Sequence, residues 1–278
     1  AAYNFGSVGQ NENADRLMGG FTFDDKTSDE YGLMVCEFDG NTPSDTTGGN
    51  IEFTLTSSPI QNRWYKSGNA NYSEAIKFEF QVMKQNFESI DSYEYSAITR
   101  WLQRKDDYKE FTVTRLDYDT VHFNAQLNVS PISVAGDIMG IAITGITDAP
   151  FGFGQLITLK TTTENGIGTL KFADMSDEIG YIYPDIEIDI SSACNLKITN
   201  ETSSEFFKLD NCVDNEVIKI DGTILEITST AISHKIYNDT NYKLPRIVND
   251  LNKRTNVFKI EGNCTLTMKY RPIRKVVI

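Results

Sequence analysis

Two strand-like segments with a helix-like segment between them, all within residues 75–127, constrain the fold more than any other part of the chain. Apolar and polar residues alternate along the first segment, with the apolar set at Ile76, Phe78, Phe80 and Val82. The second segment alternates in the same way, with Val121, Phe123, Ala125 and Leu127. A period of two residues is typical of a strand that buries one face. The sequence therefore predicts two half-buried strands here.

The segment between these strands has the marks of an amphipathic helix. Asp91 or Ser92 can cap its start, and Glu94 falls in the first turn, where a carboxylate complements the helix dipole. Apolar residues then recur at roughly helical spacing, and basic residues occupy the last turn. We expect this helix to contribute Ile98, Trp101 and Leu102 to the core. The indole of Trp101 is expected to pack against the strand at residues 76–82.

Five segments, through their order and spacing along the chain, resemble a known family. Residues 98–102 read ITRWL at the end of the helix, and residues 118–127 fit the pattern Y-x-x-x-x-F-x-A-x-L. Residues 21–33 look like the opening strand and turn of the same family, and residues 63–65 read RWY just before the first strand. Residues 180–188 look like the start of its second domain. Together the motifs resemble the distal tail protein of siphophages, the ring component at the tip of the tail.

The resemblance implies a fold and a domain plan. It implies a mainly β chain, with α+β character in a β-rich ring-forming domain that carries one main helix, followed by a galectin-like β-sandwich. We expect an assembly arm at residues 1–20, the ring-forming domain at 21–150 and the sandwich at 151–278. The arm is rich in Asn and Gly and lies before the first motif, so its role is not implied by the family. Its expected assembly contacts are Tyr3, Phe5 and Leu17, although the arm can instead fold back on its own domain.

The pattern of residues in the second half of the sequence predicts an antiparallel sandwich without reference to the family. Short alternating runs recur, and two dipeptides of the kind that favours a two-residue type I′ turn separate neighbouring runs. These are Asn165 with Gly166, and Asp221 with Gly222. Pro and Gly near residues 148–154 interrupt the pattern, and the domain boundary is expected there.

Charge is unevenly distributed along the chain. Residues 1–150 contain 11 Lys and Arg against 22 Asp and Glu, whereas residues 151–278 contain 15 against 17. A net charge of −13 argues against nonspecific nucleic-acid binding, which needs clustered basic residues. A solvated acidic surface explains the surplus in the first half. A conduit wall that repels DNA is the other explanation.

Catalytic, metal and cofactor sites are not expected from the sequence. The two histidines, His122 and His234, are interpreted as ordinary surface residues, and hydrolase, zincin and P-loop motifs are missing. The four cysteines lack C-x-x-C spacing and are interpreted as reduced thiols, with one disulfide or a labile metal as the alternative. Adjacent carboxylates offer the pairs that a glycosidase would need, but they are frequent in so acidic a chain: Asp24 and Asp25, Asp29 and Glu30, Asp106 and Asp107.

The resemblance therefore implies a structural protein of the phage tail tip and not an enzyme. It would form a ring, a hexamer in this family, that joins the tail tube to the distal hub and conducts DNA without specific binding. The implied partners are copies of the chain, the tail tube protein, the hub protein and the tape measure protein, with no membrane. The location would be the tail tip of the virion, after synthesis and assembly in the bacterial host cytoplasm. The alternatives are a carbohydrate-binding accessory module, for which tyrosines would supply stacking faces, and a cell-wall hydrolase.

Overall fold

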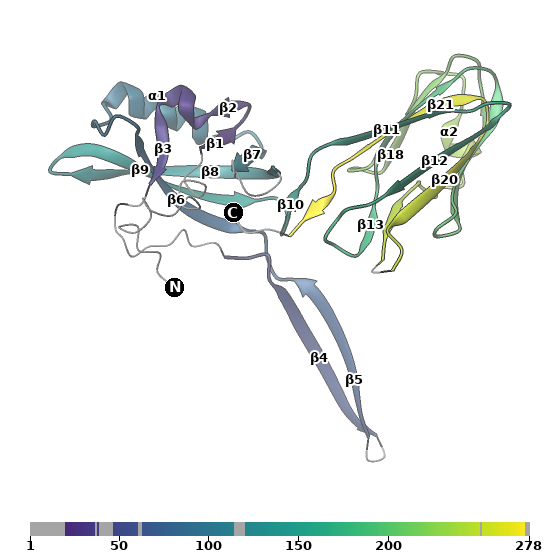
Figure 1. Cartoon of the computed structure of the whole chain (residues 1–278). Helices are drawn as coiled ribbons and strands as arrows, with labels where there is room; N and C mark the ends of the chain where they lie inside the picture. Colours follow the sequence, from purple (N-terminus) through teal and green to yellow (C-terminus); the bar gives the residue numbers. More distant parts are fainter. Residues whose placement is uncertain are drawn as a thin grey trace. The chain divides into compact units, whose positions relative to one another are not determined.

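The computed structural model describes residues 20–36, 38, 47–60, 63–113, 120–250 and 252–275. The chain divides into two compact units, one formed by residues 1–154 with 275–278 and the other by residues 155–274. Each unit has its own hydrophobic core. The predicted fold class is confirmed: the chain is mainly β, with one main helix in the first unit and a β-sandwich in the second (Figure 1).

The first unit is organised around one antiparallel sheet with the spatial order β2-β1-β7-β8-β9-β6-β3. In that order the strands are β2 (Lys26–Thr27), β1 (Phe21–Phe23), β7 (Lys109–Val113), β8 (Val121–Val134), β9 (Asp137–Thr147), β6 (Lys77–Lys84) and β3 (Leu33–Cys36). The short strand β10 (Gly152–Phe153) pairs with β8, and a 3-10 helix, η2 (Ser28–Tyr31), lies between β2 and β3. The predicted strand at residues 121–127 is the first half of β8, whose register shifts between Ile132 and Ser133.

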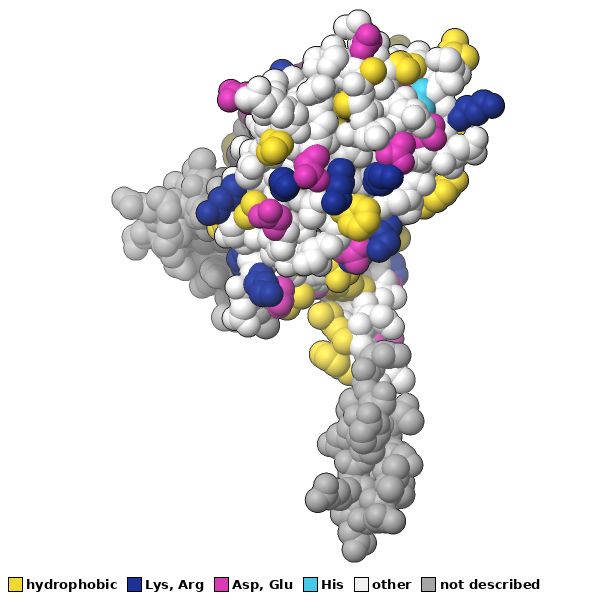
Figure 2. All heavy atoms as spheres, turned by 90° about the vertical axis from the view of Figure 1, so that its right-hand side faces the viewer, with side chains coloured by type: hydrophobic (Ala, Val, Ile, Leu, Met, Phe, Trp, Pro, Cys, Tyr) yellow, Lys and Arg dark blue, Asp and Glu magenta, His cyan; other side chains and the backbone are white. Residues whose placement is uncertain are grey.

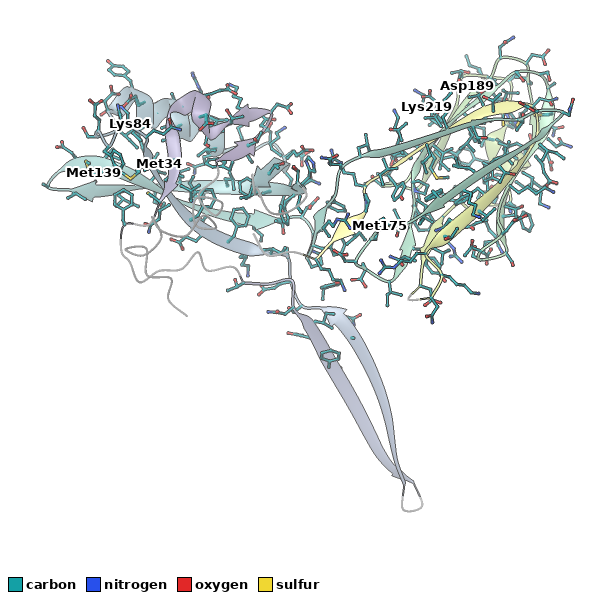
Figure 3. All side chains as sticks on the ribbon, in the orientation of Figure 1. Met34, Lys84, Met139, Met175, Asp189 and Lys219 are labelled. Atoms are coloured by element: carbon teal, nitrogen blue, oxygen red, sulfur yellow. The ribbon has the colours of Figure 1, made fainter. Side chains whose placement is uncertain are left out.

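Helix α1 (Ser92–Leu102) covers one face of this sheet and packs against β8 (Figure 1). Asp91 is the N-cap: its Oδ1 atom accepts hydrogen bonds from the backbone N–H groups of Tyr93 and Glu94, each at 2.8 Å. The Glu94 carboxylate accepts from the Asp91 N–H in return, which completes a capping box. Lys84 of β6 lies beside α1 (Figure 3), and its Nζ atom contacts Glu94 Oε1 at 2.8 Å. Side chains therefore fix the first turn of the helix.

Glycine makes room for aromatic rings inside this sheet. Gly145 of β9 lies directly opposite Phe78 of β6 in the strand register. A Cβ atom at position 145 would stand 2.2 Å from the Phe78 ring, far closer than any van der Waals contact allows. Phe78 is 3% exposed and stacks on Phe111 at 5.0 Å between ring centroids. The missing side chain therefore lets the Phe78 ring lie flat over the neighbouring strand.

A long hairpin forms a separate two-stranded sheet within the first unit (Figure 1). Strand β4 (Ile51–Ile60) pairs with β5 (Arg63–Tyr72) over all ten residues of each strand. At a rise of about 3.4 Å per residue, each strand spans roughly 34 Å. The described side chains of β4 are exposed to solvent, with Ile51 41% and Phe53 73% exposed.

The second unit is a sandwich of two antiparallel sheets around a shared core. One sheet consists of β11 (Ile157–Thr162), β21 (Cys264–Tyr270), β14 (Asp185–Ile190), β17 (Val217–Asp221) and β18 (Glu226–Ser229). The facing sheet consists of β12 (Ile167–Ala173), β20 (Thr255–Glu261), β15 (Cys194–Asn200) and β16 (Glu205–Cys212). The remaining elements are β13 (Gly180–Ile182), which pairs with β19 (Ile247–Asn249), the short helix α2 (Ile236–Asp239) and β22 (Ile273–Arg274).

The two predicted type I′ turns have different outcomes. Asn165 and Gly166 both have the positive φ that this turn requires, but the flanking strands β11 and β12 belong to different sheets. The second prediction is wrong, because β17 and β18 are joined by a four-residue loop at residues 222–225. Asp221 Oδ1 accepts from the N–H groups of Thr223 and Ile224 and holds this wider loop. Gly222 is needed because a Cβ atom there would stand 2.1 Å from the carbonyl oxygen of Tyr183.

Candidate functional site

The residues expected to matter for assembly and for the helix core have different outcomes in the structure. Tyr3, Phe5 and Leu17 lie outside the described residues. Ile98, Trp101 and Leu102 are all buried on the inner face of α1, at 3%, 4% and 0% exposure.

Trp101 is enclosed by aromatic rings from the first strand and the 3-10 helix. Its indole stacks on Tyr31 at 4.3 Å and on Phe21 at 5.6 Å between ring centroids. The indole Nε1 donates a 2.9 Å hydrogen bond to the carbonyl oxygen of Phe23. Phe21 links the indole to the strand at residues 76–82, because its ring centroid lies 5.2 Å from that of Phe80. The helix therefore fixes β1 and η2 through one side chain.

His122 lies on the sheet surface, half-buried, with a carboxylate and a hydroxyl beside it. Its Nδ1 atom is 2.8 Å from Glu110 Oε1 and 3.3 Å from Thr112 Oγ1. A threonine hydroxyl next to a histidine is a weak nucleophile unless an electrophile can reach it and an oxyanion-binding group lies nearby. Neighbouring positions of β8 carry amides, and Asn124 Nδ2 donates to Asp148 Oδ2 at 2.9 Å. These contacts form a surface hydrogen-bond network.

His234 is buried, so its interpretation as a surface residue is wrong. The side chain is 1% exposed, and that of Glu216 is fully buried beside it. Nδ1 of His234 is 2.6 Å from Glu216 Oε1, and Nε2 is 2.9 Å from the carbonyl oxygen of Asp210. Both ring nitrogens therefore face oxygen atoms, and Nδ1 is paired with the Glu216 carboxyl. Ser229 Oγ also donates to Glu216 Oε1, at 2.5 Å.

This buried network lowers the pKa of the Glu216 carboxyl. Burial alone would raise its pKa, but hydrogen bonds from Ser229, the Val213 N–H and His234 outweigh burial and hold the pKa below the ordinary value of 4.5. The Ser229 hydroxyl donates to the carboxylate and not to the imidazole, unlike the serine of a Ser-His-Asp triad. The arrangement is a buried network of hydrogen bonds in the core of the sandwich. Glu216 and His234 are 18 positions apart and share no motif, so sequence reasoning missed them.

Asp174 is a second buried carboxyl in the sandwich, with no exposed surface. Burial raises its pKa above the ordinary value of 3.8, although Ser176 N and Oγ both donate hydrogen bonds to Oδ1. A carboxyl group whose pKa is raised on folding contributes stability that is fully present below its pKa in the unfolded chain. This contribution is lost as pH rises through the folded-state pKa.

We therefore expect Asp174→Asn to remove a decline of stability with rising pH. In the wild type, the free energy of unfolding of the sandwich should contain a term that falls as pH rises from the ordinary aspartate value through the folded-state pKa, because the unfolded chain holds fewer protons there. Urea denaturation at a series of pH values measures this. Asp189→Asn, at an exposed position of the same unit, should keep the decline. Parallel pH profiles for the wild type and Asp174→Asn would contradict the prediction.

The adjacent carboxylates considered as glycosidase pairs are engaged in structural contacts. Asp24 and Asp106 both contact the Arg104 guanidinium, at 3.3 and 3.5 Å. Glu30 accepts a hydrogen bond from the Thr27 N–H at 3.1 Å, and Asp29 accepts from Gln85 Nε2 at 2.9 Å. In the described part of the chain, no three His, Cys, Asp or Glu side chains come together in a way that would hold a metal ion. None of the described helices has the length and apolar character needed to cross a membrane.

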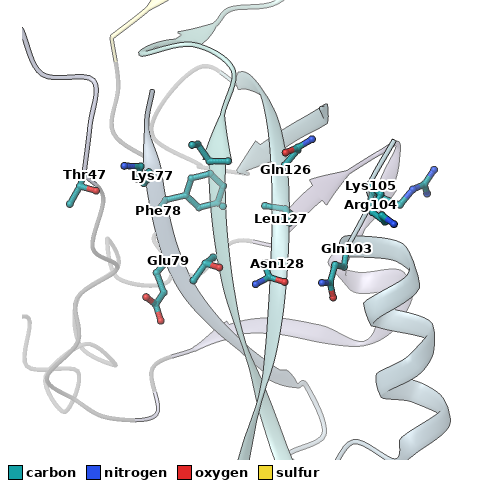
Figure 4. Close-up of a pocket in the computed structure, with 13 residues that line it drawn as sticks. Thr47, Lys77, Phe78, Glu79, Gln103, Arg104, Lys105, Gln126, Leu127 and Asn128 are labelled. Atoms are coloured by element: carbon teal, nitrogen blue, oxygen red, sulfur yellow. The ribbon is translucent and has the colours of Figure 1, made fainter. Parts of the chain in front are cut away.

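An open depression of about 580 Å³ lies on the first unit between the main sheet and the end of α1 (Figure 4). The side chains that line it are mostly amides, hydroxyls and charges, and none is a histidine, cysteine or serine. They come from the α1 end and from β6, β8 and β9: Gln103, Arg104, Lys105, Lys77, Phe78, Glu79, Gln126, Leu127, Asn128, Thr144, Gly145 and Ile146, together with Thr47. Such a surface suits contact with a polar macromolecule more than it suits chemistry on a small molecule.

The tyrosines considered as sugar-stacking faces are exposed to different degrees. Tyr181 is 57% exposed, and the Arg246 guanidinium lies 3.9 Å from its ring centre, so one face of the ring is already occupied. Tyr237 and Tyr242 are 60% and 70% exposed, and the Tyr242 hydroxyl donates to the Tyr237 carbonyl oxygen. Figure 2 shows basic and acidic side chains interspersed with apolar ones over one face of the sandwich. This mixture is typical of an ordinary solvated surface.

Comparison with known proteins places the chain among phage tail proteins. Residues 18–149 match the family described as the phage tail protein N-terminal domain, and residues 151–270 match the phage tail C-terminal domain. No curated protein matches by sequence.

One solved structure gives the fold a reference. The chain is similar to the Dit protein of phage SPP1, described as a paradigm of the hub adsorption apparatus in phages that infect Gram-positive bacteria. The two share 10% identity and a TM-score of 0.61, over 91% of this chain and 98% of that chain. A chain of the phage p2 baseplate, in its activated conformation with Sr, has 9% identity, a TM-score of 0.46 and coverage of 91% and 97%. The chain therefore belongs to the phage tail proteins, with the fold of a distal tail protein, and is a structural component of the tail.

Proposed function

We propose that this protein forms a ring at the tip of the phage tail, and that the ring, a hexamer, joins the tail tube to the distal hub and conducts DNA. It works by assembly, without turnover of a substrate. Copies of the chain, the tube protein, the hub protein and the tape measure protein are its proposed partners, and the bacterial cytoplasm is the proposed place of assembly. The fold and the two family matches support this proposal, because they cover both units of the chain.

The observation that carries the proposal is the hairpin of β4 and β5. A two-stranded hairpin without further strands or a covering layer is at best marginally stable in water. This one has ten residues in each strand, pairs with no other strand among the described residues, and exposes Ile51 and Phe53 at its base. Its outer edges carry backbone groups that another chain can pair with. We infer that a second copy of the protein stabilises the hairpin, and that repetition of this contact closes the ring.

The open face of the main sheet supports the conduit. Along β8 the side chains of Phe123 and Leu127 face the core beneath α1, so Asn124 and Asn128 face the other way and are exposed. Thr144 of β9 is exposed on the same face, opposite Asn128. Amides and hydroxyls do not release counterions from DNA, and the net charge of −11 in residues 1–150 has the same sign as the phosphates. A wall of this kind lets DNA pass without adhering.

Native mass spectrometry of the full chain, with and without the hairpin, tests the proposal. We expect a hexamer for the wild type at micromolar concentration, and a shift to monomers when residues 52–71 are replaced by a short glycine-containing turn. Phe53→Ala should weaken assembly in the same direction by a smaller amount, because it removes one exposed apolar contact and leaves the backbone intact.

Two results would contradict this assignment. One is a wild-type chain that stays monomeric with and without its tube and hub partners. The other is a hairpin deletion that leaves the hexamer unchanged. Tyr93→Ala, at an 89% exposed position of α1, is the matched control for loss of an exposed aromatic ring and should not change the mass of the assembly.

A further inference from the structure

Three of the four cysteines gather at one end of the sandwich. Cys194 begins β15, Cys212 ends β16 and Cys264 begins β21. All are free thiols; Cys212 and Cys264 are each 2% exposed, and Cys194 is half-buried. The backbone N–H of Asn263 donates a 3.3 Å hydrogen bond to Cys194 Sγ, which ties the Cys194 thiol to the start of β21. The sequence offers no C-x-x-C motif here, and the sandwich alone brings these thiols together.

A β-bulge aligns two of these thiols. Cys194 and Cys212 are directly opposite in the antiparallel pair of β15 and β16, and the next opposed pair is Leu196 with Leu209. One residue of β15 therefore faces two residues of β16. Asn211, one of the two, has a positive φ, the left-handed conformation that bulges use. Without the extra residue, Cys212 would point to solvent; with it, Cys212 turns into the core on the same side as Cys194.

The spacing of such a pair is close to that of a disulfide. Directly opposed residues of an antiparallel pair have Cβ atoms about 4.5–5.5 Å apart. A disulfide needs about 3.5–4.5 Å between Cβ atoms, and about 4.4–6.8 Å between Cα atoms. A local adjustment of the strand ends, next to an existing bulge, is enough to close the difference. Cys264 belongs to the facing sheet and has Ile190 as its register partner, so it is not opposed to Cys194 in a strand pair.

We propose that Cys194 and Cys212 are a redox-responsive pair that a small disulfide oxidant converts into a cross-strand disulfide. In the first step the Cys194 thiolate attacks the oxidant disulfide, forms a mixed disulfide and releases one oxidant thiolate. In the second step Cys212, after losing its proton to solvent, attacks Cys194 Sγ and releases the second oxidant thiolate. Two protein thiols are oxidised, one oxidant disulfide is reduced to two thiols, and the released protons balance the charge.

The burial of the three thiols sets the order of these steps. Burial raises the pKa of Cys212 and of Cys264 to about 12, so both stay protonated near neutral pH and are poor first nucleophiles. Cys194 is the thiol with solvent access. Once Cys194 carries the mixed disulfide, the opposed Cys212 has a high effective concentration, and the second step does not require the oxidant itself to reach Cys212. The same burial disfavours a metal site, because metals bind the thiolate form.

The experiment is oxidation of the full chain with oxidised glutathione, followed by thiol titration in denaturant and peptide mapping by mass spectrometry. We expect the titre to fall from four thiols per chain to two, with a cross-linked peptide that joins Cys194 and Cys212. Cys194→Ser and Cys212→Ser should each lose the cross-link. Cys36→Ser, in the other unit, and Cys264→Ser are matched controls and should each fall from three thiols to one.

Several outcomes would overturn the proposal. A titre that stays at four, a stable glutathione adduct with only one thiol lost, or a cross-link from Cys194 to Cys264 would each refute the assigned pair. A disulfide between two chains would refute it as well. The peptide map of the wild type decides the question even if a serine variant fails to fold. Ring formation does not enter the test, so its result is independent of the function proposed above.

Discussion

Trp101→Ala is expected to lower the free energy of unfolding of the first unit by about 3–5 kcal/mol. The indole is 4% exposed and lies between the rings of Tyr31 and Phe21. Its removal deletes a large buried surface and leaves a cavity. It also removes the hydrogen bond that Nε1 donates to the Phe23 carbonyl oxygen. Since that oxygen belongs to β1, the variant should also loosen the first strand of the sheet.

Chemical denaturation followed by circular dichroism measures this change. The transition of the sandwich should stay where it is in the wild type and serves as an internal reference. Tyr93→Ala is the matched control, because it removes an aromatic side chain from the same helix at an 89% exposed position. Surface substitutions of this kind change the free energy of unfolding by less than about 0.5 kcal/mol. A loss below about 1 kcal/mol for Trp101→Ala would show that the indole does not support the core.

Glu216→Ala is expected to destabilise the sandwich by a similar amount, about 3–5 kcal/mol. Removing one partner of a buried polar pair leaves the other without compensation in a medium of low dielectric constant. The His234 ring is that other partner, and its Nδ1 atom lies 2.6 Å from Glu216 Oε1. The Ser229 hydroxyl and the Val213 N–H would lose their acceptor at the same time.

The same pair predicts a dependence on acid. Because the folded-state pKa of Glu216 lies below 4.5, its contribution to stability is present above that value and is lost as pH falls through the folded-state pKa. The sandwich should therefore become less stable on acidification, and Glu216→Gln should reduce this acid sensitivity. Urea denaturation across the acid range measures both effects.

An exposed ion pair of the same sandwich supplies the control. Glu187 contacts Lys219 at 3.2 Å between Oε2 and Nζ, and both side chains are open to solvent. Glu187→Gln should therefore cost at most about 1 kcal/mol. Equal losses of the free energy of unfolding for Glu216→Ala and Glu187→Gln would contradict the prediction.

The parts of the fold that local sequence determines were predictable. Helix α1 is an example, because its cap at Asp91 and its apolar stripe lie within one short segment of the chain. Strand β6 was predictable for the same reason, since alternation is a property of neighbouring residues. Strand β8 was predicted as two separate strands, one at residues 121–127 and a short one at residues 132–134. Pro131, which lies between them, is tolerated within the strand and lies opposite Ile141.

Contacts between distant residues were not predictable from pattern alone. Glu216 and His234 meet because the residue before β17 and the segment before α2 converge on the end of β16, and each residue taken singly looks like an ordinary surface residue. The dipeptide of Asp221 and Gly222 has the composition of a tight turn, but tertiary packing against Tyr183 decides where the glycine is needed. The alternation of Ile51, Phe53 and Leu55 indicates the first strand of the hairpin, whereas β5 contains Gly68 and several polar residues that weaken the strand pattern.

The close approach of Phe78 and Gly145 bears on how this sheet can vary during evolution. The side chains at the two positions fill one fixed volume, which the Phe78 ring occupies because Gly145 has only a hydrogen atom as its side chain. A larger residue at 145 is tolerable only when position 78 becomes smaller, so the two sites should change together and not independently. Among related tail proteins, an exchange of sizes between these positions would preserve the sheet, whereas a larger residue at 145 alone would force β6 and β9 apart.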